Sequence, residues 1–277
     1  MNTLPCDLHV HTSASDGTEN PAEVVEKAGK AGLTALAVTD HDTIRGVAPA
    51  LEAGREIGIT VLPGVELAAE EEDGEVHLLG YLFDPHHPLL REELARLEKA
   101  RLARVERMVE KIRALGIPLA LERVLALAGE GTVGRPHVAR ALVEIGAVGS
   151  VAEAFARYLE RHGPAYVPRL KMAPEEAVLL IRRAGGVAVL AHPGLSRCEE
   201  LIPRLVSAGL QGLEVYHPEH TPQMVEHYRG LCRRYGLLAT GGSDYHGAGH
   251  RRYSRLGEVT APDEVVEKML ALAGRTA

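Results

Sequence analysis

The sequence of 277 residues has no tryptophan, only two phenylalanines and only three cysteines. Cys6, Cys198 and Cys232 are far apart, are odd in number and include no Cys-x-x-Cys pair. This pattern excludes a disulfide framework and a zinc–thiolate site. It indicates buried thiols in a reducing cytoplasm.

Long apolar runs are also missing. No segment approaches the run of about 18 apolar residues that crosses a membrane, and the opening MNTLPCDLHV lacks the basic and apolar regions of a signal peptide. We therefore expect a cytoplasmic protein without a membrane span. The net charge of -7 argues against an extended nucleic-acid surface. A short nucleic-acid end in a local basic, metal-lined pocket is still compatible with it.

Histidine is plentiful by contrast, with 14 residues, and two of them open the first predicted strand. Side chains at alternate positions of a strand share one face. Asp7, His9 and His11 are therefore expected to point together, with Leu8 and Val10 on the other face. The pair is either a metal-binding pair or two surface histidines on a half-exposed strand.

Strand-like and helix-like segments alternate along most of the chain, which predicts a parallel sheet, closed into a barrel or doubly wound. A helix is expected to begin at Pro21, with Asn20 as its N-cap and Glu23 in its first turn. Further helices are predicted at 47–57, from 174, at 199–208, at 222–235 and from 262. Strands are predicted at 33–39, 59–65, 76–83, 187–191, 212–216 and 237–240.

One segment, residues 89–166, shows helical patterning and no convincing strand. Its stretch 90–115 is rich in Glu, Arg, Leu and Ala, which favour helix. We predict an inserted helical cap subdomain at 89–166, over the mouth of a barrel formed by 1–88 and 167–277.

Histidines and carboxylates recur where the predicted strands end. The carboxyl ends of strands build the active site in parallel barrels, and imidazole and carboxylate together suit Zn, Mn or Fe ions. A cap or turn role is the alternative for each aspartate taken alone, and we interpret the other histidines as solvated or loop residues. The strand-end residues are His9, His11, Asp16, Asp40, His41, Asp42, Glu66, His77, His192, Glu214, His217, Asp244 and His246; the other histidines are His86, His87, His162, His220, His227 and His250.

The ordered motifs D-L-H-V-H-T-S-A-S-D-G, T-D-H-D, P-G-V-E, A-H-P and G-S-D-Y-H resemble those of the PHP (polymerase and histidinol phosphatase) superfamily of metal-dependent phosphoesterases. The resemblance extends over nearly the whole chain. It implies a distorted (β/α)7 TIM-like barrel, here with a helical insertion, and two or three divalent ions at the strand ends. Manganese is the expected metal, with zinc or iron as alternatives.

The resemblance also implies which residues bind these ions. One ion is expected on His9, His11, Glu66 and Asp244, which would hold the attacking water; a second on Asp16, His41 and His246; and a third on Glu66, His77 and His192. Some relatives have histidine where this chain has Asp16. Asp7 and Asp40 are expected either to orient imidazoles from behind or to support the structure.

Within the superfamily, the chain is most similar to nucleoside 3',5'-bisphosphate phosphatases and to the related RNase AM-type 5'-to-3' exoribonucleases. The similarity lies in the stretches G-R-P-H-V-A and L-K-M-A-P-E-E-A and in the histidine after E-V-Y. It implies that Arg135, Lys171 and His217 bind the substrate's 5'-phosphate. A helix-start contact is the alternative for Arg135 and a surface ion pair for Lys171.

The expected activity is metal-dependent hydrolysis of the 3'-phosphoester of a nucleoside 3',5'-bisphosphate or a short 5'-phosphorylated oligonucleotide. Histidinol-phosphate phosphatase and a general small-molecule phosphomonoesterase are rival enzymes with the same metal site. A non-catalytic PHP module of the kind found in polymerase subunits is a rival of another class.

Overall fold

The computed structural model describes residues 5–71, 74–170, 172–196, 198–247, 255–262 and 264–274. The chain forms two compact units, one of Met1–Glu92 with Lys171–Ala277 and one of Glu93–Leu170. Both boundaries lie four residues later than those predicted from sequence (93 against 89 and 171 against 167). The placement of the inserted unit over the barrel stays a prediction. Among the described residues, no helix has the length and apolar character to cross a membrane.

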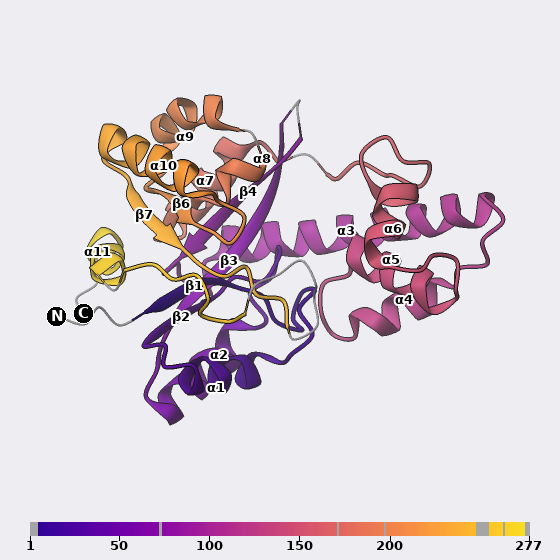
Figure 1. Cartoon of the computed structure of the whole chain (residues 1–277), viewed down its shortest axis with the longest axis horizontal. Helices are drawn as coiled ribbons and strands as arrows, with labels where there is room; N and C mark the ends of the chain where they lie inside the picture. The colour runs from indigo at the N-terminus through magenta and orange to yellow at the C-terminus, as the bar shows by residue number, and fades with distance from the viewer. Residues whose placement is uncertain are drawn as a thin grey trace. The chain divides into compact units, whose positions relative to one another are not determined.

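The first unit is built on a seven-stranded sheet whose order in space follows the chain, β1 to β7 (Figure 1). The strands are β1 (Cys6–Val10), β2 (Ala35–Val38), β3 (Thr60–Glu71), β4 (Gly74–Tyr81), β5 (Val187–Leu190), β6 (Gly212–Tyr216) and β7 (Leu238–Gly241). An isolated bridge between Val10 and Tyr245 joins the sheet's two edges, and the His11 N–H donates to the Tyr245 carbonyl at 2.8 Å. The sheet is therefore a nearly closed barrel, which confirms the predicted fold class.

The direction of β4 differs from the predicted all-parallel arrangement. It runs antiparallel to both β3 and β5, whereas the other neighbours are parallel. β3 ends at Glu71 and β4 begins at Gly74. So short a connection allows only antiparallel pairing, because a parallel crossover needs a dozen or more residues.

β3 is also longer than the predicted strand 59–65, and this changes the place of Glu66. The strand continues to Glu71, so Glu66 lies in its middle, opposite Leu79 of β4. The continued pairing with β4 provides hydrogen-bond partners that a strand ending at residue 65 would lack. Glu66 thus lies on a paired strand, where its backbone is held more firmly than in a loop.

Helices cover the outside of the barrel, with α1 beside β2, α2 beside β3, α7 beside β3 to β5, α10 beside β6 and β7, and α9 packed against α7 (Figure 1). The Asn20 side chain accepts the backbone N–H of Glu23, and the Glu23 carboxylate accepts that of Asn20, which confirms the predicted helix start. The helices are α1 (Pro21–Lys30), α2 (Val47–Ile57), α7 (Pro174–Arg183), α8 (Pro193–Ser196), the 3-10 helix η2 (Glu199–Leu201), α9 (Ile202–Ala208), α10 (Pro222–Tyr235) and α11 (Glu264–Leu272).

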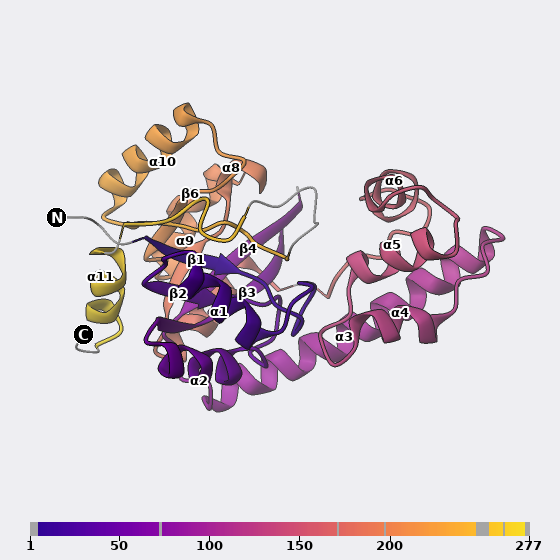
Figure 2. The same cartoon turned by 60° about the horizontal axis from the view of Figure 1, so that its bottom comes forward.

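Apolar clusters pack against both faces of the strands in this unit. Leu8 belongs to a cluster inside the barrel with residues of α11, which lies beside the start of β1 in Figure 2. Val10 belongs instead to the cluster that packs under α1 and α2. The expectation that Leu8 and Val10 share one face is therefore wrong. The register of β1 against β2 shifts between Asp7 and Val10, and such an irregularity rotates the side chains that follow it.

The inserted unit has its own apolar core, contributed by each of its helices. Arg104 is buried in it, donates Nε–H to the Val167 carbonyl at 2.7 Å and lies over the Tyr166 ring. The helices are α3 (Pro88–Ala114), whose first residues belong to the barrel unit, α4 (Leu121–Ala128), α5 (Arg135–Glu144), α6 (Val151–Ala154) and the π-helix η1 (Phe155–Leu159).

Closure of the barrel predicts a sharp difference between two glycines. A Cβ at Gly242, just after β7, would lie 2.4 Å from the His9 nitrogen, whereas the nearest atom to a Cβ at Gly230 in α10 is the end of Arg233 at 3.9 Å. Gly242→Ala should therefore destabilise the protein by at least ~1–3 kcal/mol through overpacking. Gly230→Ala should stabilise it by about 0.5–1 kcal/mol. Urea denaturation of both variants checks this; equal stabilities would contradict the close approach of β7 to His9.

Candidate metal centre

The carboxylate of Glu66 lies at the centre of the polar side chains inside the barrel. The side chain is buried, and its Oε2 lies 2.8 Å from His41 Nδ1, 3.3 Å from His11 Nε2 and 3.6 Å from His9 Nε2. These imidazoles come from the ends of β1 and β2. One oxygen of Glu66 thus faces side chains from two other strands.

The second oxygen of Glu66 faces the opposite pair of strands. Oε1 lies 2.8 Å from His77 Nδ1 and 3.2 Å from His192 Nε2. His77 reaches it because β4 is antiparallel: Leu79 is the residue directly opposite Glu66, and His77 lies diagonally across, within side-chain reach. The two oxygens of Glu66 therefore face two different groups of imidazoles.

The first group has the spacing of ligands around a single ion. Asp244 Oδ1 lies 3.3 Å from both His9 Nε2 and His11 Nε2, and these two nitrogens are 3.1 Å apart. Bonds of about 2.1 Å place neighbouring ligand atoms about 3.0 Å apart around an octahedral ion and about 3.4 Å apart around a tetrahedral one. The observed spacings agree with this range.

A second group surrounds Asp16, in the loop after β1. His246 Nε2 lies 3.4 Å from Asp16 Oδ1, while His11 Nδ1 and His41 Nε2 each lie 3.9 Å from an Asp16 oxygen. Each of these four residues offers a ligand atom within 4.8 Å of the others. The predicted set of Asp16, His41 and His246 is thus brought together, with His11 as an additional member.

The third group shares Glu66 with the first. His41, Glu66 and His77 offer ligand atoms within the same spacing, and His192 approaches the oxygen of Glu66 that His77 contacts. The expected third set was Glu66, His77 and His192. All nine predicted ligand residues therefore lie in one continuous cluster, although His11 and His41 each take part in two groups.

The carboxylates of the cluster remain ionised despite their burial. Burial alone would raise the pKa of Glu66, but the neighbouring His41 and His77 imidazoles hold it well below its ordinary value. The pKa of Asp16 is likewise held well below its usual range, against its burial, chiefly by His246 and His41. Burial, together with His246 and His41, lowers the pKa of His11 to about 3. His11 is therefore a neutral imidazole, the form that binds a metal.

Several buried nitrogen atoms of the cluster lack hydrogen-bond partners and could bind a cation. His11 Nδ1, His77 Nε2 and His192 Nδ1 are buried and have no hydrogen-bond partner. A buried polar atom left in this state costs about 1–3 kcal/mol. Imidazole nitrogens and carboxylate oxygens are the ligands that Zn, Mn and Fe accept. The residues present therefore fit a group of divalent metal ions.

Asp7 and Asp40 hold the loops that carry the cluster. Asp7 accepts the backbone N–H groups of Ser243 and Gly257, both at 2.9 Å. Asp40 accepts the Thr12 N–H at 2.7 Å and its hydroxyl at 2.7 Å. These hydrogen bonds go to backbone and hydroxyl groups rather than to imidazoles, so the contacts favour the structural-support alternative for both aspartates.

The backbone is strained at two residues of the cluster. His192 has φ of +26° and Asp244 has φ of +51°, and residues other than glycine rarely adopt such positive values. Such conformations cost on the order of 1–3 kcal/mol and persist where the surrounding structure enforces them. These strained backbone conformations direct the side chains of His192 and Asp244 into the cluster.

Glu214 of β6 is the buried acid to which the sequence analysis gave no role. Its Oε1 lies 2.8 Å from His9 Nδ1, and its Oε2 accepts the His192 backbone N–H at 2.8 Å. Burial raises its pKa, but His9 more than compensates and holds it below the ordinary value. The signal available in the sequence was the alternation along β6, which puts Glu214 on the opposite face of the strand from Leu213 and Val215.

The three predicted phosphate-binding residues differ in where they lie. His217 is buried, with Nε2 3.6 Å from Asp244 Oδ2. Arg135 is the first residue of α5 in the inserted unit, where its guanidinium lies 5.8 Å from the centre of the Phe155 ring. Lys171 lies outside the described residues. These positions leave the role of all three in substrate binding as a proposal.

The histidines interpreted as solvated or loop residues include one that is buried. His220 is 8% exposed, with Nδ1 donating to the Val215 carbonyl and Nε2 accepting the Gly194 N–H. It is a structural histidine, not a solvated one. His227 pairs with Glu199 at the surface. His86, His87 and His162 are outside the cluster, and His250 lies outside the described residues.

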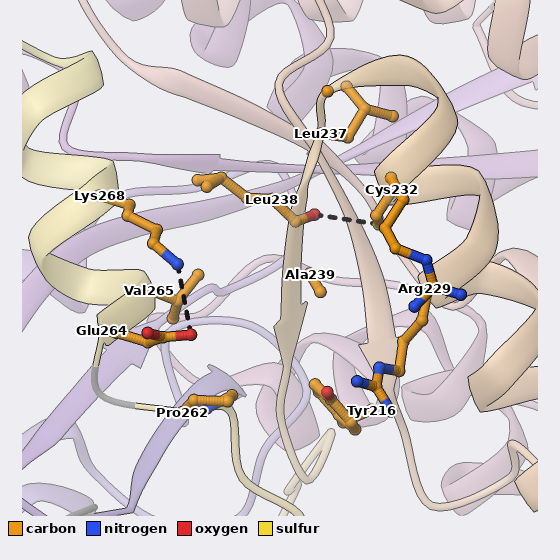
Figure 3. A pocket seen from close by; sticks show the side chains of 12 residues that line it. Tyr216, Arg229, Cys232, Leu237, Leu238, Ala239, Pro262, Glu264, Val265 and Lys268 are labelled. Carbon is orange, nitrogen blue, oxygen red and sulfur yellow. Dashed lines mark hydrogen bonds and ion pairs between the residues drawn. The ribbon is translucent and has the colours of Figure 1, made fainter.

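A separate pocket of about 420 Å³ lies at the start of β7, between α10 and α11 (Figure 3). Its charged lining residues are Arg229, Arg233, Glu264 and Lys268, and the last two form an ion pair. Cys232 points its thiol at the Leu238 carbonyl there, and burial raises the pKa of this thiol to about 11. None of the nine cluster residues lines this pocket, so the cluster remains the candidate site.

Comparison with known proteins agrees with this geometry. Residues 7–94 match the PHP domain model. The 5'-3' exoribonuclease Rnm of Escherichia coli (strain K12) is 38% identical over 247 residues, which are 87% of this chain and 84% of that protein. The chain belongs to the PHP family.

Two further proteins resemble this PHP chain over most of its length. The 3',5'-nucleoside bisphosphate phosphatase of Chromobacterium violaceum is 36% identical over 249 residues, 88% of this chain and 87% of that protein. The crystal structure of a proposed metal-dependent phosphoesterase from Bifidobacterium adolescentis covers 97% of this chain and 96% of its own, with 37% identity and a TM-score of 0.90.

The central place of Glu66 in the PHP barrel predicts a loss of bound metal on its removal. Glu66→Ala takes away both oxygens that the imidazoles face, so bound metal per chain, measured by plasma mass spectrometry, should fall by at least one ion. Turnover should be abolished while circular dichroism stays unchanged. Glu226→Ala, which removes an exposed carboxylate on α10, is the control. Wild-type metal content in Glu66→Ala would show that the cluster binds metal without Glu66.

Proposed function

We propose that this metal-dependent phosphoesterase hydrolyses the 3'-phosphoester of nucleoside 3',5'-bisphosphates and of short 5'-phosphorylated oligoribonucleotides. The observation that carries the proposal is the continuous cluster of nine histidine, aspartate and glutamate side chains around Glu66. Relatives of this chain are named for a bisphosphate phosphatase and an exoribonuclease, and both names describe cleavage of nucleotide phosphoesters.

The residues of the cluster would share the work of holding the metal ions. His9, His11, Glu66 and Asp244 would hold one ion; Asp16, His41 and His246 a second; and Glu66, His77 and His192 a third. Divalent ions bound there lower the pKa of water towards neutrality and offset the negative charge of the phosphoryl group. Manganese is our expected metal, as the resemblance to the PHP superfamily implies, and zinc and iron are the alternatives, because imidazole and carboxylate ligands suit all three.

His217 would donate a hydrogen bond to the substrate. Its Nδ1 accepts the Glu219 N–H at 3.2 Å, so the neutral ring carries its proton on Nε2. That nitrogen is the one near Asp244, on the side of the cluster. An N–H in this position would bind an oxygen of the substrate's 5'-phosphate. No serine or cysteine nucleophile is required.

Arg135 and Lys171 would bind the 5'-phosphate, the part of the substrate that does not react. The planar guanidinium of Arg135 suits two phosphate oxygens, and the Lys171 ammonium adds a point charge. Binding energy from a remote group of this kind is used to position the reacting bond.

We further expect the enzyme to work in the cytoplasm, since its three cysteines are buried as thiols.

A substrate panel with Mn²⁺ tests the proposed function against its rivals. It should contain adenosine 3',5'-bisphosphate, a 5'-phosphorylated short RNA, histidinol phosphate and a general phosphomonoester. The proposal expects the highest kcat/KM on the bisphosphate or the RNA. A preference for histidinol phosphate would replace the substrate assignment, equal rates on all four would indicate a general phosphatase, and no turnover of any would indicate a non-catalytic module.

The role of Arg135 predicts a loss that depends on the substrate. Charge-assisted hydrogen bonds contribute about 1.5–3 kcal/mol, so Arg135→Ala should lower kcat/KM on adenosine 3',5'-bisphosphate by about ten- to a hundredfold. Adenosine 3'-monophosphate, which lacks the 5'-phosphate, should lose far less. Arg140→Ala, in the same helix, is the control for a general loss of positive charge. Equal losses on the two substrates would contradict the proposed contact between Arg135 and the 5'-phosphate.

A further inference from the structure

Glu214 is a buried carboxylate that touches two residues of the metal centre without facing the centre itself. The side chain has no solvent exposure and lies on β6, a different strand from either residue it contacts. Oε1 lies 2.8 Å from His9 Nδ1, and Oε2 accepts the His192 backbone N–H at 2.8 Å. Both of its oxygens are thus committed to His9 and His192.

The contact with His9 decides which nitrogen of that ring is available to a metal ion. His9 Nδ1 faces Glu214, while His9 Nε2 faces His11, Glu66 and Asp244. A neutral imidazole has one N–H and one lone pair. If Nδ1 donates to Glu214, the lone pair is on Nε2, on the side of the cluster. Glu214 therefore selects the tautomer that binds a metal there.

The contact with His192 fixes the backbone at a strained position. His192 has φ of +26°, and its N–H points at Glu214 Oε2. α8 begins at the next residue, Pro193, so the chain turns sharply here. The hydrogen bond holds the turn that sends the His192 side chain towards Glu66 Oε1. One carboxylate thus links the side of the centre near His9 to the side near His192.

We propose that Glu214 is a positioning residue of the metal centre, which fixes the tautomer of His9 and the backbone of His192 and whose charge strengthens metal binding. The proposal rests on the metal-dependent function proposed above. A carboxylate behind a ligating imidazole raises the basicity of that imidazole, and the loss of such a partner typically weakens metal binding by 10- to 100-fold.

The experiment measures Mn²⁺ affinity directly, in protein stripped with a chelator and then titrated with Mn²⁺ alone. Glu214→Gln keeps the shape of the side chain and one oxygen but removes the charge, and Glu214→Ala removes the contacts altogether. We expect the tightest Mn²⁺ site to weaken by about 10- to 100-fold in Glu214→Gln and by at least as much in Glu214→Ala. Turnover of Glu214→Gln at saturating Mn²⁺ should recover most of the wild-type rate.

Tyr81→Phe is the matched control for general damage to this part of the barrel. The buried Tyr81 hydroxyl donates to the Leu8 carbonyl at 2.8 Å, next to His9 in the chain, and makes no hydrogen bond to a side chain of the cluster. Its Mn²⁺ affinity should remain within about twofold of wild type. Wild-type affinity in Glu214→Gln, or an equal loss in Tyr81→Phe, would overturn the proposal. Because affinity is read without substrate, this outcome is distinct from failure of the substrate panel.

Discussion

The structure depends on the burial of one carboxylate, Glu66, in the interior of a narrow barrel. An ionised carboxylate in this position is costly unless positive charge or several hydrogen-bond donors surround it. The chain meets this requirement by directing His9, His11, His41, His77 and His192 to its two oxygens from four strand regions. The arrangement that makes Glu66 tolerable in the absence of metal would also let both of its oxygens hold metal ions.

The barrel departs from regular parallel architecture at the point where this carboxylate needs it. β4 turns back along β3, which places His77 diagonally opposite Glu66 and keeps Glu66 within a paired strand. At the other end of the barrel, apolar side chains such as Leu8 and Leu62 fill the interior with help from α11. The interior is therefore divided into an apolar layer that stabilises the fold and a polar layer that carries the chemistry.

More of the candidate site than of the detailed sheet structure could be predicted from the sequence. His9, His41 and Asp244 stand out because each is a polar residue where an apolar strand ends, and the order of their motifs is specific. The antiparallel direction of β4 was missed, although the Asp73-Gly74 pair is a hairpin signal. The alternation of β6 could have drawn attention to Glu214, but its contact with His9 could not be predicted, because it joins residues 205 positions apart in the chain and only the closed barrel brings them together.

The central proposal is that Glu66 would hold metal at both of its oxygens. Its most direct test is an anomalous difference map from a crystal of the protein grown with Mn²⁺, recorded on both sides of the manganese edge. The account predicts separate manganese peaks on either side of the Glu66 carboxylate, one beside His9 and His11 and one beside His77 and His192. A map in which Glu66 contacts no manganese peak, or in which one peak alone lies beside a single oxygen, would contradict it.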